Sequence, residues 1–112
     1  PAGGEAVAAT LARMPRRETH LICGMLNTKD VTGYMTPLAP QVTRLHAVSI
    51  PGEKNTLPAE VTCDAARAAG IDAVSAPSVA MALATIAAKS PEARVLICGS
   101  LYLAGSVLRE NG

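Results

Sequence analysis

The fold is decided by the stretch Val95-Leu96-Ile97-Cys98-Gly99-Ser100-Leu101-Tyr102-Leu103-Ala104-Gly105-Ser106-Val107-Leu108. It predicts a buried strand that stops at Gly99-Ser100 and turns directly into an apolar helix. Turns of this kind bind the ligands of α/β domains. The first N–H groups of a helix have no intrahelical partner, so with the helix dipole and the Ser100 hydroxyl they can hold a carboxylate or a phosphate. An ordinary N-cap explains Ser100 as well, and both interpretations stay open.

The rest of the chain repeats this alternation of strands and helices. Val7, Leu11 and Met14 favour a helix that opens after Gly3-Gly4 and ends at Pro15. The other expected elements are a strand at 20–23, a helix capped by Asp30 that runs to about Leu38, a strand at 44–50, a helix at 57–69 capped by Thr56 and followed by Gly70, a strand at 72–76, a helix that Ser78 caps and Ser90-Pro91 closes, and a strand at 94–98. Strands separated by helices predict an α/β fold, with a mainly parallel sheet and helices on both faces.

Composition and charge exclude several classes of protein. The 112 residues are 49% hydrophobic but contain no Phe or Trp and only two Tyr, which indicates one domain with a tight aliphatic core. A net charge of +1, without aromatic residues among basic ones, is unlike a nucleic-acid-binding protein. No stretch approaches the ~20 apolar residues that cross a bilayer, and the start lacks the features of a signal peptide. We therefore expect a cytoplasmic protein with neither a nucleic-acid nor a membrane partner.

The cysteines and histidines form no catalytic or metal motif. Three cysteines without a Cys-x-x-Cys pair, and without histidines at ligand spacing, argue against a disulfide framework and a zinc site. Cys23 and Cys98 end similar Leu-Ile-Cys-Gly strands, so they could lie close together on neighbouring strands, although buried cysteine is usually a small apolar residue. His20 precedes a predicted strand and His46 lies inside one, and the sequence reveals no nucleophile or carboxylate partner for either. We interpret both as core or surface histidines.

Four predicted turns meet at the carboxyl edge of the sheet, where open α/β sheets bind ligands. The turns at 24–30, 51–56, 75–78 and 99–102 supply Lys29, Asp30, Glu53, Lys54, Ser100 and Tyr102. The positive charge of Lys29 could face a glutamate or a phosphate. A helix-capping Asp30 beside a solvated Lys29 explains the pair as well. The segment 52–56 lacks the spacing of a phosphate-binding loop.

Four motifs, in order along the chain, resemble one enzyme family. They are Pro1-Ala-Gly-Gly-Glu-Ala6, Gly24-Met-Leu-Asn-Thr-Lys-Asp30, Ile50-Pro-Gly-Glu-Lys-Asn-Thr-Leu-Pro-Ala-Glu60 and Cys98-Gly-Ser-Leu-Tyr-Leu-Ala-Gly-Ser-Val-Leu-Arg109. Together they span nearly the whole chain. They resemble the C-terminal domain of folylpolyglutamate synthase/dihydrofolate synthase, a Mur ligase-like family that adds L-glutamate to folates with ATP. The resemblance implies a Rossmann-like fold with further strands that the pattern does not place.

The same resemblance implies a division of labour. It assigns Ser100 to the incoming glutamate, with Gly99 allowing close backbone approach, Tyr102 lining the pocket, and Lys29 and Asp30 as accessory residues. No catalytic or metal-binding residue is expected in the chain. ATP, Mg²⁺ and folate or dihydropteroate would be bound mainly by the family's N-terminal ATPase domain, whose Asp-Gly-x-His-Asn motif would fall just before Pro1. We expect residues 1–112 to be a single C-terminal domain without ligase activity of its own.

Two other functions stay open. A stand-alone α/β module would hold a small carboxylate or phosphate at the Gly99-Ser100 helix start without any chemistry. A structural or interaction domain would use Ser100 only as a helix cap. A ligand-induced change at residues 99–102 would separate this last function from the other two.

Overall fold

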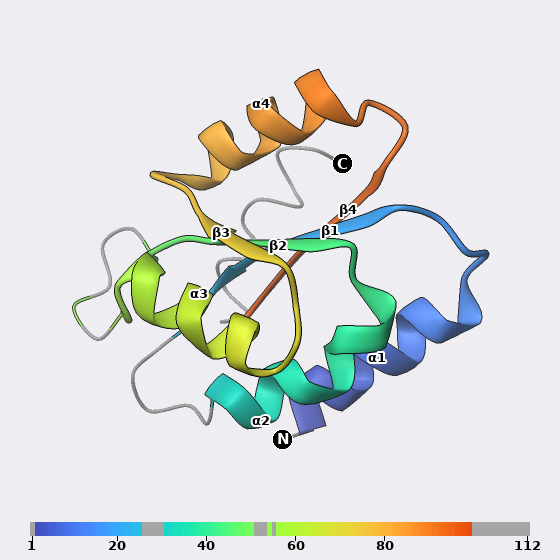
Figure 1. Cartoon of the computed structure of the whole chain (residues 1–112), viewed down its shortest axis with the longest axis horizontal. Coiled ribbons are helices and arrows are strands. Elements are labelled where there is room, and N and C mark those ends of the chain that lie inside the picture. The colour runs from blue at the N-terminus through green and yellow to red at the C-terminus, as the bar shows by residue number, and fades with distance from the viewer. Residues whose placement is uncertain (1, 26–30, 51–53, 55, 100–112) are drawn as a thin grey trace.

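The centre of the molecule is a four-stranded sheet, in which all three pairs of neighbouring strands are parallel (Figure 1). The computed structural model describes residues 2–25, 31–50, 54 and 56–99. The strand order is β3-β2-β1-β4, which is the order of the first four strands of a Rossmann fold. The predicted α/β class and parallel sheet are therefore confirmed. The strands are β1 (Thr19–Gly24), β2 (Arg44–Ala47), β3 (Ala73–Ser75) and β4 (Arg94–Gly99).

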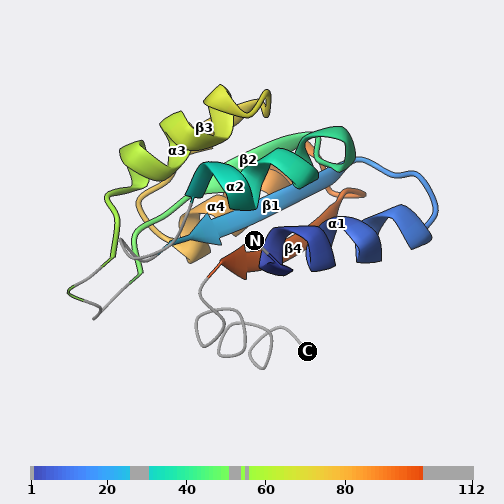
Figure 2. The same cartoon turned by 90° about the horizontal axis from the view of Figure 1, so that it is seen from below.

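One face of the sheet carries most of the helical structure (Figures 1 and 2). Fully buried side chains of β1 and β2, such as Leu21 and Leu45, pack there against Met35 and Leu38. The elements on this face are α1 (Ala2–Arg13), α2 (Val31–Met35), the 3₁₀-helix η1 (Thr36–Gln41) and α3 (Ala59–Ala68).

The opposite face is covered by α4 (Val79–Lys89) alone within the described residues (Figure 1). Its smaller core joins Ile22 and Val48 from the sheet to Ala82 and Ile86 of the helix. Helices on both faces, as predicted, explain why all residues of β1, and residues 45–47 of β2, are buried rather than alternating.

Helix boundaries follow the local sequence at two predicted positions. The Ser78 hydroxyl accepts a hydrogen bond from the backbone N–H of Met81 at 3.1 Å, so Ser78 is the N-cap of α4. Gly70 ends α3 with φ +94°, and its N–H and that of Ile71 bond the carbonyls of Arg67 and Ala66. This paired C-terminal motif requires a left-handed residue, which glycine adopts without strain.

Other expected boundaries are wrong. α1 already begins at Ala2, before the Gly3-Gly4 pair. The second α-helix ends at Met35, and a 3₁₀-helix continues through Leu38 because Pro37 and Pro40 supply no N–H for α-helical bonds. Thr56 does not cap α3, which starts after Pro58 with no side-chain cap.

Strand β2 also differs from its expected form. It ends at Ala47 rather than Ile50, and Ser49 is exposed. Leu45 and Ala47 belong to the core on one face of the sheet and Val48 to the core under α4 on the other, and both sets are buried. The capping role of Asp30 falls outside the described residues.

Candidate functional site at the carboxyl edge of the sheet

The twin strands β1 and β4 end together at the carboxyl edge of the sheet. Their register pairs Cys23 with Cys98 and Gly24 with Gly99, so the two Leu-Ile-Cys-Gly sequences lie side by side as anticipated. Gly99 is the last residue of β4, which confirms the predicted strand end. The other predicted site residues, Ser100, Tyr102, Lys29 and Asp30, lie outside the described part of the chain, as does Glu53. Lys54 is exposed.

Backbone hydrogen bonds brace this edge between neighbouring strands. The N–H of Val48 donates to the Cys23 carbonyl at 2.9 Å, and the N–H of Ala76 donates to the Ala47 carbonyl at 2.8 Å. A third bond, from the N–H of Leu57 to the Met25 carbonyl at 2.9 Å, ties the loop before α3 to the residue after β1. The exits of β1, β2 and β3 are therefore joined into one platform.

Thr56 has a role in this platform that the sequence did not reveal. Its hydroxyl oxygen accepts from the N–H of Ile50 at 2.7 Å and its hydroxyl group donates to the Leu57 carbonyl at 3.2 Å. Ser49 donates to the same carbonyl at 3.3 Å. Thr56 closes the loop after β2 instead of capping α3. The available signal was Pro58: it favours extended backbone at Leu57, the residue before it, and so places the helix start after Pro58 rather than after Thr56.

A pair of thiols lies directly beneath the edge. Cys23 and Cys98 are both buried and both face the α1–α3 side of the sheet. A hydrogen bond to Cys98, helped by burial, raises the pKa of the Cys23 thiol well above its ordinary value. The pKa of Cys98 is lowered by the hydrogen bond from Cys23, against burial, and also by a hydrogen bond from Tyr34. Cys98 is thus the acceptor of the pair.

A second buried polar cluster lies on the α4 face of the sheet, between β1 and β2. His20 Nδ1 is 3.0 Å from His46 Nε2, and His20 Nε2 is 2.6 Å from Glu18 Oε2. Both imidazoles are buried, so the histidines are core residues as expected, but the view that they lack a carboxylate partner is wrong. The i, i+2 spacing of Glu18 and His20 at the start of a strand, which places both on one face, was the missed signal.

Electrostatics within this cluster favour the neutral form of the His46 imidazole. Burial, and secondarily the charges of His20 and Arg44, lower the pKa of His46 to about 4. The pKa of Glu18 is lowered by hydrogen bonds from Ser90 and then His20. The cluster runs from Glu18 and His20 at the start of β1 to His46, the penultimate residue of β2.

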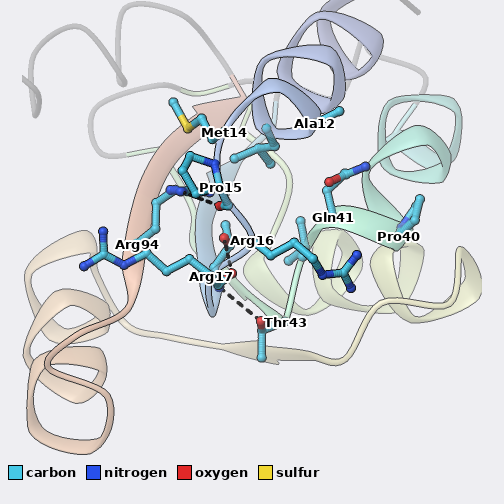
Figure 3. A pocket seen from close by; sticks show the side chains of 12 residues that line it. Ala12, Met14, Pro15, Arg16, Arg17, Pro40, Gln41, Thr43 and Arg94 are labelled. Atoms are coloured by element: carbon cyan, nitrogen blue, oxygen red, sulfur yellow. Dashed lines mark hydrogen bonds between the residues drawn. The ribbon is translucent and has the colours of Figure 1, made fainter.

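A hollow of about 390 Å³ occupies the amino edge of the sheet (Figure 3). Its lining includes three arginines, but the side chains of Arg16 and Arg17 point to opposite sides rather than converging (Figure 3). Arg17 Nε donates to the Glu92 carbonyl at 3.0 Å, and Arg94 Nη2 donates to the Pro15 carbonyl at 2.9 Å. These bonds join the start of β4 to the segment that precedes β1. The role of Arg17 and Arg94 here is therefore structural.

Metal and membrane sites are not formed by the residues that the structure describes. No group of three or more His, Cys, Asp or Glu side chains among them could hold a metal ion, so they do not fit a Mg²⁺ site. Among the same residues, no helix combines the length and the apolar character needed to span a membrane.

Comparison with known protein families identifies the family of this chain. The sequence profile of the family described as "Mur ligase, glutamate ligase domain" matches residues 1–101. The chain belongs to this Mur ligase C-terminal domain family. The match includes Gly99 and the strand exits that are joined by backbone hydrogen bonds at the carboxyl edge. It confirms the family that the four motifs indicated. Among curated proteins, none matches the chain.

Solved structures similar to this Mur ligase domain are folate ligases. E. coli FolC in complex with DHPP and ADP is 23% identical with a TM-score of 0.78, covering 96% of this chain and 25% of its own. Mycobacterium tuberculosis folylpolyglutamate synthase complexed with ADP and AMPPCP is 25% identical with a TM-score of 0.75, covering 99% and 27%.

A third similar structure carries more ligands. A bifunctional folylpolyglutamate synthase/dihydrofolate synthase with Mn, AMPPNP and L-glutamate bound is 16% identical with a TM-score of 0.73, covering 96% of this chain and 25% of its own. The Mur ligase domain thus spans about a quarter of the length of each protein that it matches.

Proposed function

We propose that the chain is the C-terminal, glutamate-side domain of an ATP-dependent ligase that joins L-glutamate to dihydropteroate or folates through an acyl phosphate. The observation that carries the proposal is the end of β4 at Gly99, on the carboxyl edge of a parallel sheet, within the region matched by the glutamate ligase family. Similar solved structures with ADP, Mn and L-glutamate support it.

The proposed glutamate site is built on the turn that follows β4. Gly99 lets the ligand approach the backbone, the Ser100 hydroxyl and the first N–H groups after it hold a carboxylate, and the Tyr102 ring lines the pocket. Lys29 and Asp30 leave the paired strand β1 and serve as accessory residues. The braced platform of β1, β2 and β3, together with the pairing of β4 to β1, supplies the rigid support on which ligand geometry depends.

ATP and Mg²⁺ belong mainly to the N-terminal ATPase domain in this proposal. When bound there, they activate the folate carboxylate by phosphorylation. The chain contributes the glutamate side, because a helix start with a Ser100 hydroxyl suits a carboxylate, whereas no group of three or more His, Cys, Asp or Glu among the described residues could hold a metal ion. Residues 1–112 are then one domain, and the chain alone carries out no ligation. Closure of the two domains completes the site.

A domain exchange tests the enzymatic part of the proposal. The chain replaces the corresponding C-terminal domain of E. coli FolC, and formation of the amide product is followed with ATP, dihydropteroate and L-glutamate. We expect product from the chimera and none from the 112-residue chain. Turnover by the chain alone, or an inactive but folded chimera, would contradict the proposal.

A matched pair of serine variants tests the glutamate site. In the chimera, Ser100→Ala should raise the KM for L-glutamate about 10-fold or more, since a hydrogen bond to a charged group contributes about 1.5–3 kcal/mol. The KM for ATP should not change. Ser78→Ala removes another N-cap from the same edge and is the control. Equal effects of both variants would reduce Ser100 to a helix cap.

The 112-residue chain by itself separates the binding alternatives. In an NMR titration, L-glutamate should shift the backbone amides of residues 99–102 more than inorganic phosphate does. A response to phosphate alone would favour the stand-alone anion-binding module. No response to either ligand, together with an inactive chimera, would favour a structural domain.

A further inference from the structure

We propose that Cys23 and Cys98 form an oxidisable dithiol, in which Cys98 is attacked first by a small peroxide and Cys23 then closes an intrachain disulfide. The proposal concerns a modification site beneath the carboxyl edge and does not depend on glutamate binding. Three observations carry it: the strand register, the shared face of the two side chains, and the hydrogen bonds to the Cys98 sulfur.

The register brings the two residues within bonding reach. Cys23 and Cys98 are directly paired across β1 and β4, and neighbouring strands lie about 4.8 Å apart. Disulfides join Cα atoms about 4.4–6.8 Å apart, with Cβ atoms at about 3.5–4.5 Å. Only a slight approach of the strands is needed. Within the described sheet β4 is an edge strand, so it can move toward β1 without disturbing another neighbour.

The two sulfurs differ in their hydrogen bonds, which sets the order of reaction. Cys98 accepts from Cys23 and from Tyr34, and accepted hydrogen bonds stabilise the thiolate, the form that reacts with peroxide. Cys23 donates its proton and remains a thiol. Cys98 is also the more exposed of the two, at 5% against 0%. Its place near the end of an edge strand lets local opening admit a reagent as small as hydrogen peroxide.

The chemistry balances in two steps. The Cys98 thiolate attacks one peroxide oxygen; an S–O bond forms, the O–O bond breaks, and hydroxide leaves and takes up the proton released by Cys98. The Cys23 sulfur then attacks the Cys98 sulfur; the S–S bond forms, the S–O bond breaks, and the departing hydroxide takes the Cys23 proton. Two thiols are oxidised and one hydrogen peroxide is reduced to water.

The third cysteine provides a control within the chain. Cys63 lies on α3, is also buried, and has a thiol pKa that burial raises. No register pairs it with another cysteine, since it belongs to a helix. Peroxide selectivity between Cys63 and the Cys23–Cys98 pair therefore separates a specific dithiol from general oxidation of buried thiols.

Peptide mapping of the folded 112-residue chain tests the proposal. After peroxide treatment, free thiols are alkylated under denaturing conditions. The chain and Cys63→Ala should both yield one linked peptide that contains Cys23 and Cys98, and a thiol reductant should abolish it. In Cys23→Ala, a diketone probe for sulfenic acid should label Cys98, whereas in Cys98→Ala it should leave Cys23 unlabelled.

Several outcomes would overturn the proposal. These are full alkylation of all three cysteines after peroxide, a disulfide that includes Cys63, or labelling of Cys23 in place of Cys98. Mapping of the unaltered chain gives a result even if an alanine variant fails to fold. No ligand is present in the experiment, so its failure is distinguishable from failure of the proposed glutamate site.

Discussion

The two faces of the sheet solve the same packing problem in different ways. On the α1–α3 face, a large core of aliphatic side chains surrounds Leu21 and Leu45. On the α4 face, one helix covers a smaller cluster around Ile22 and Ile86, and the buried His20–His46 pair lies on the same side of the strands. Each face also receives fully buried aliphatic residues from the strands, Leu21 and Leu45 on one and Ile22 on the other, so these apolar residues alone do not distinguish the faces.

The difference shows where polar groups can be buried. A buried imidazole is tolerated only if its nitrogens are hydrogen-bonded. His46 Nε2 is hydrogen-bonded to His20 Nδ1. The other ring nitrogen of His20, Nε2, is hydrogen-bonded to the carboxylate of Glu18 at the surface. This row of hydrogen bonds ends at a solvent-exposed carboxylate, that of Glu18. It lies on the face that α4 alone covers among the described residues. The α1–α3 face has aliphatic packing instead, and Thr62 Oγ1 on α3 is the one buried side-chain oxygen without a partner among the residues that the structure describes.

Truncation of one core residue on each face should give the largest effects. Leu45→Ala leaves a cavity in a central strand and should lower the free energy of unfolding by about 4 kcal/mol, measured by urea denaturation. Ile86→Ala should cost only about 2–3 kcal/mol, because α4 alone covers its face and can settle into the space. Equal costs would show that the two faces are equally rigid.

Acid should act mainly on the α4 face. The pKa of His46 is depressed to about 4 in the folded chain, whereas the unfolded chain binds its proton near pH 6.5. The unfolded state therefore binds more protons between these values, and stability falls as pH drops from about 6.5 to about 4. We expect a loss of about 2 kcal/mol over this interval.

Two variants assign that pH dependence. His46→Gln keeps a donor for His20 Nδ1 and should flatten the change in unfolding free energy between pH 6.5 and 4. Glu18→Gln should leave this interval largely unchanged and reduce the further loss at lower pH, because the pKa of Glu18 is also lowered. An unaltered pH profile in His46→Gln would assign the acid sensitivity to carboxylates.

Local sequence was sufficient for the elements whose boundaries depend on nearby residues. Ser78 caps α4 and Gly70 ends α3 because each effect acts within a few residues. Apolar runs located each of the four strands in the described sheet. Errors arose where tertiary structure decides: Thr56 bonds to Ile50 across a loop rather than to its own helix, and β2 ends at Ala47 rather than Ile50.

The candidate sites differ in the same way. The glutamate site was predicted from one continuous strand-turn-helix motif and a family resemblance, and of its residues Gly99 lies where expected. The His20–His46 chain and the role of Tyr34 at Cys98 depend on strand register and helix packing. The register between strands depends on the whole sheet, so it cannot be predicted from the residues that neighbour each position in the sequence.

A glycine at the end of α3 tests the larger face with a smaller effect. Gly70→Ala should cost about 1–2 kcal/mol, because a left-handed conformation at φ +94° strains any residue with a Cβ. No atom lies within 4 Å of the added carbon, so the cost is confined to the backbone. Gly70→Asn should cost less, since asparagine tolerates this region. A greater loss for asparagine, measured by thermal denaturation, would point to crowding instead.

The N-cap of α4 should give the smallest effect and sharpen the comparison of the faces. Ser78→Ala removes the bond to the Met81 N–H and should cost about 1 kcal/mol, whereas Ser78→Asp should retain stability because a carboxylate also caps the helix and favours its dipole. Since α4 alone covers its face among the described residues, fraying of its first turn should also raise amide exchange at Ile22 and Val48. Exchange that rises equally at Leu21 and Leu45 would mean that both faces open together, and the sheet would then respond as a single cooperative unit.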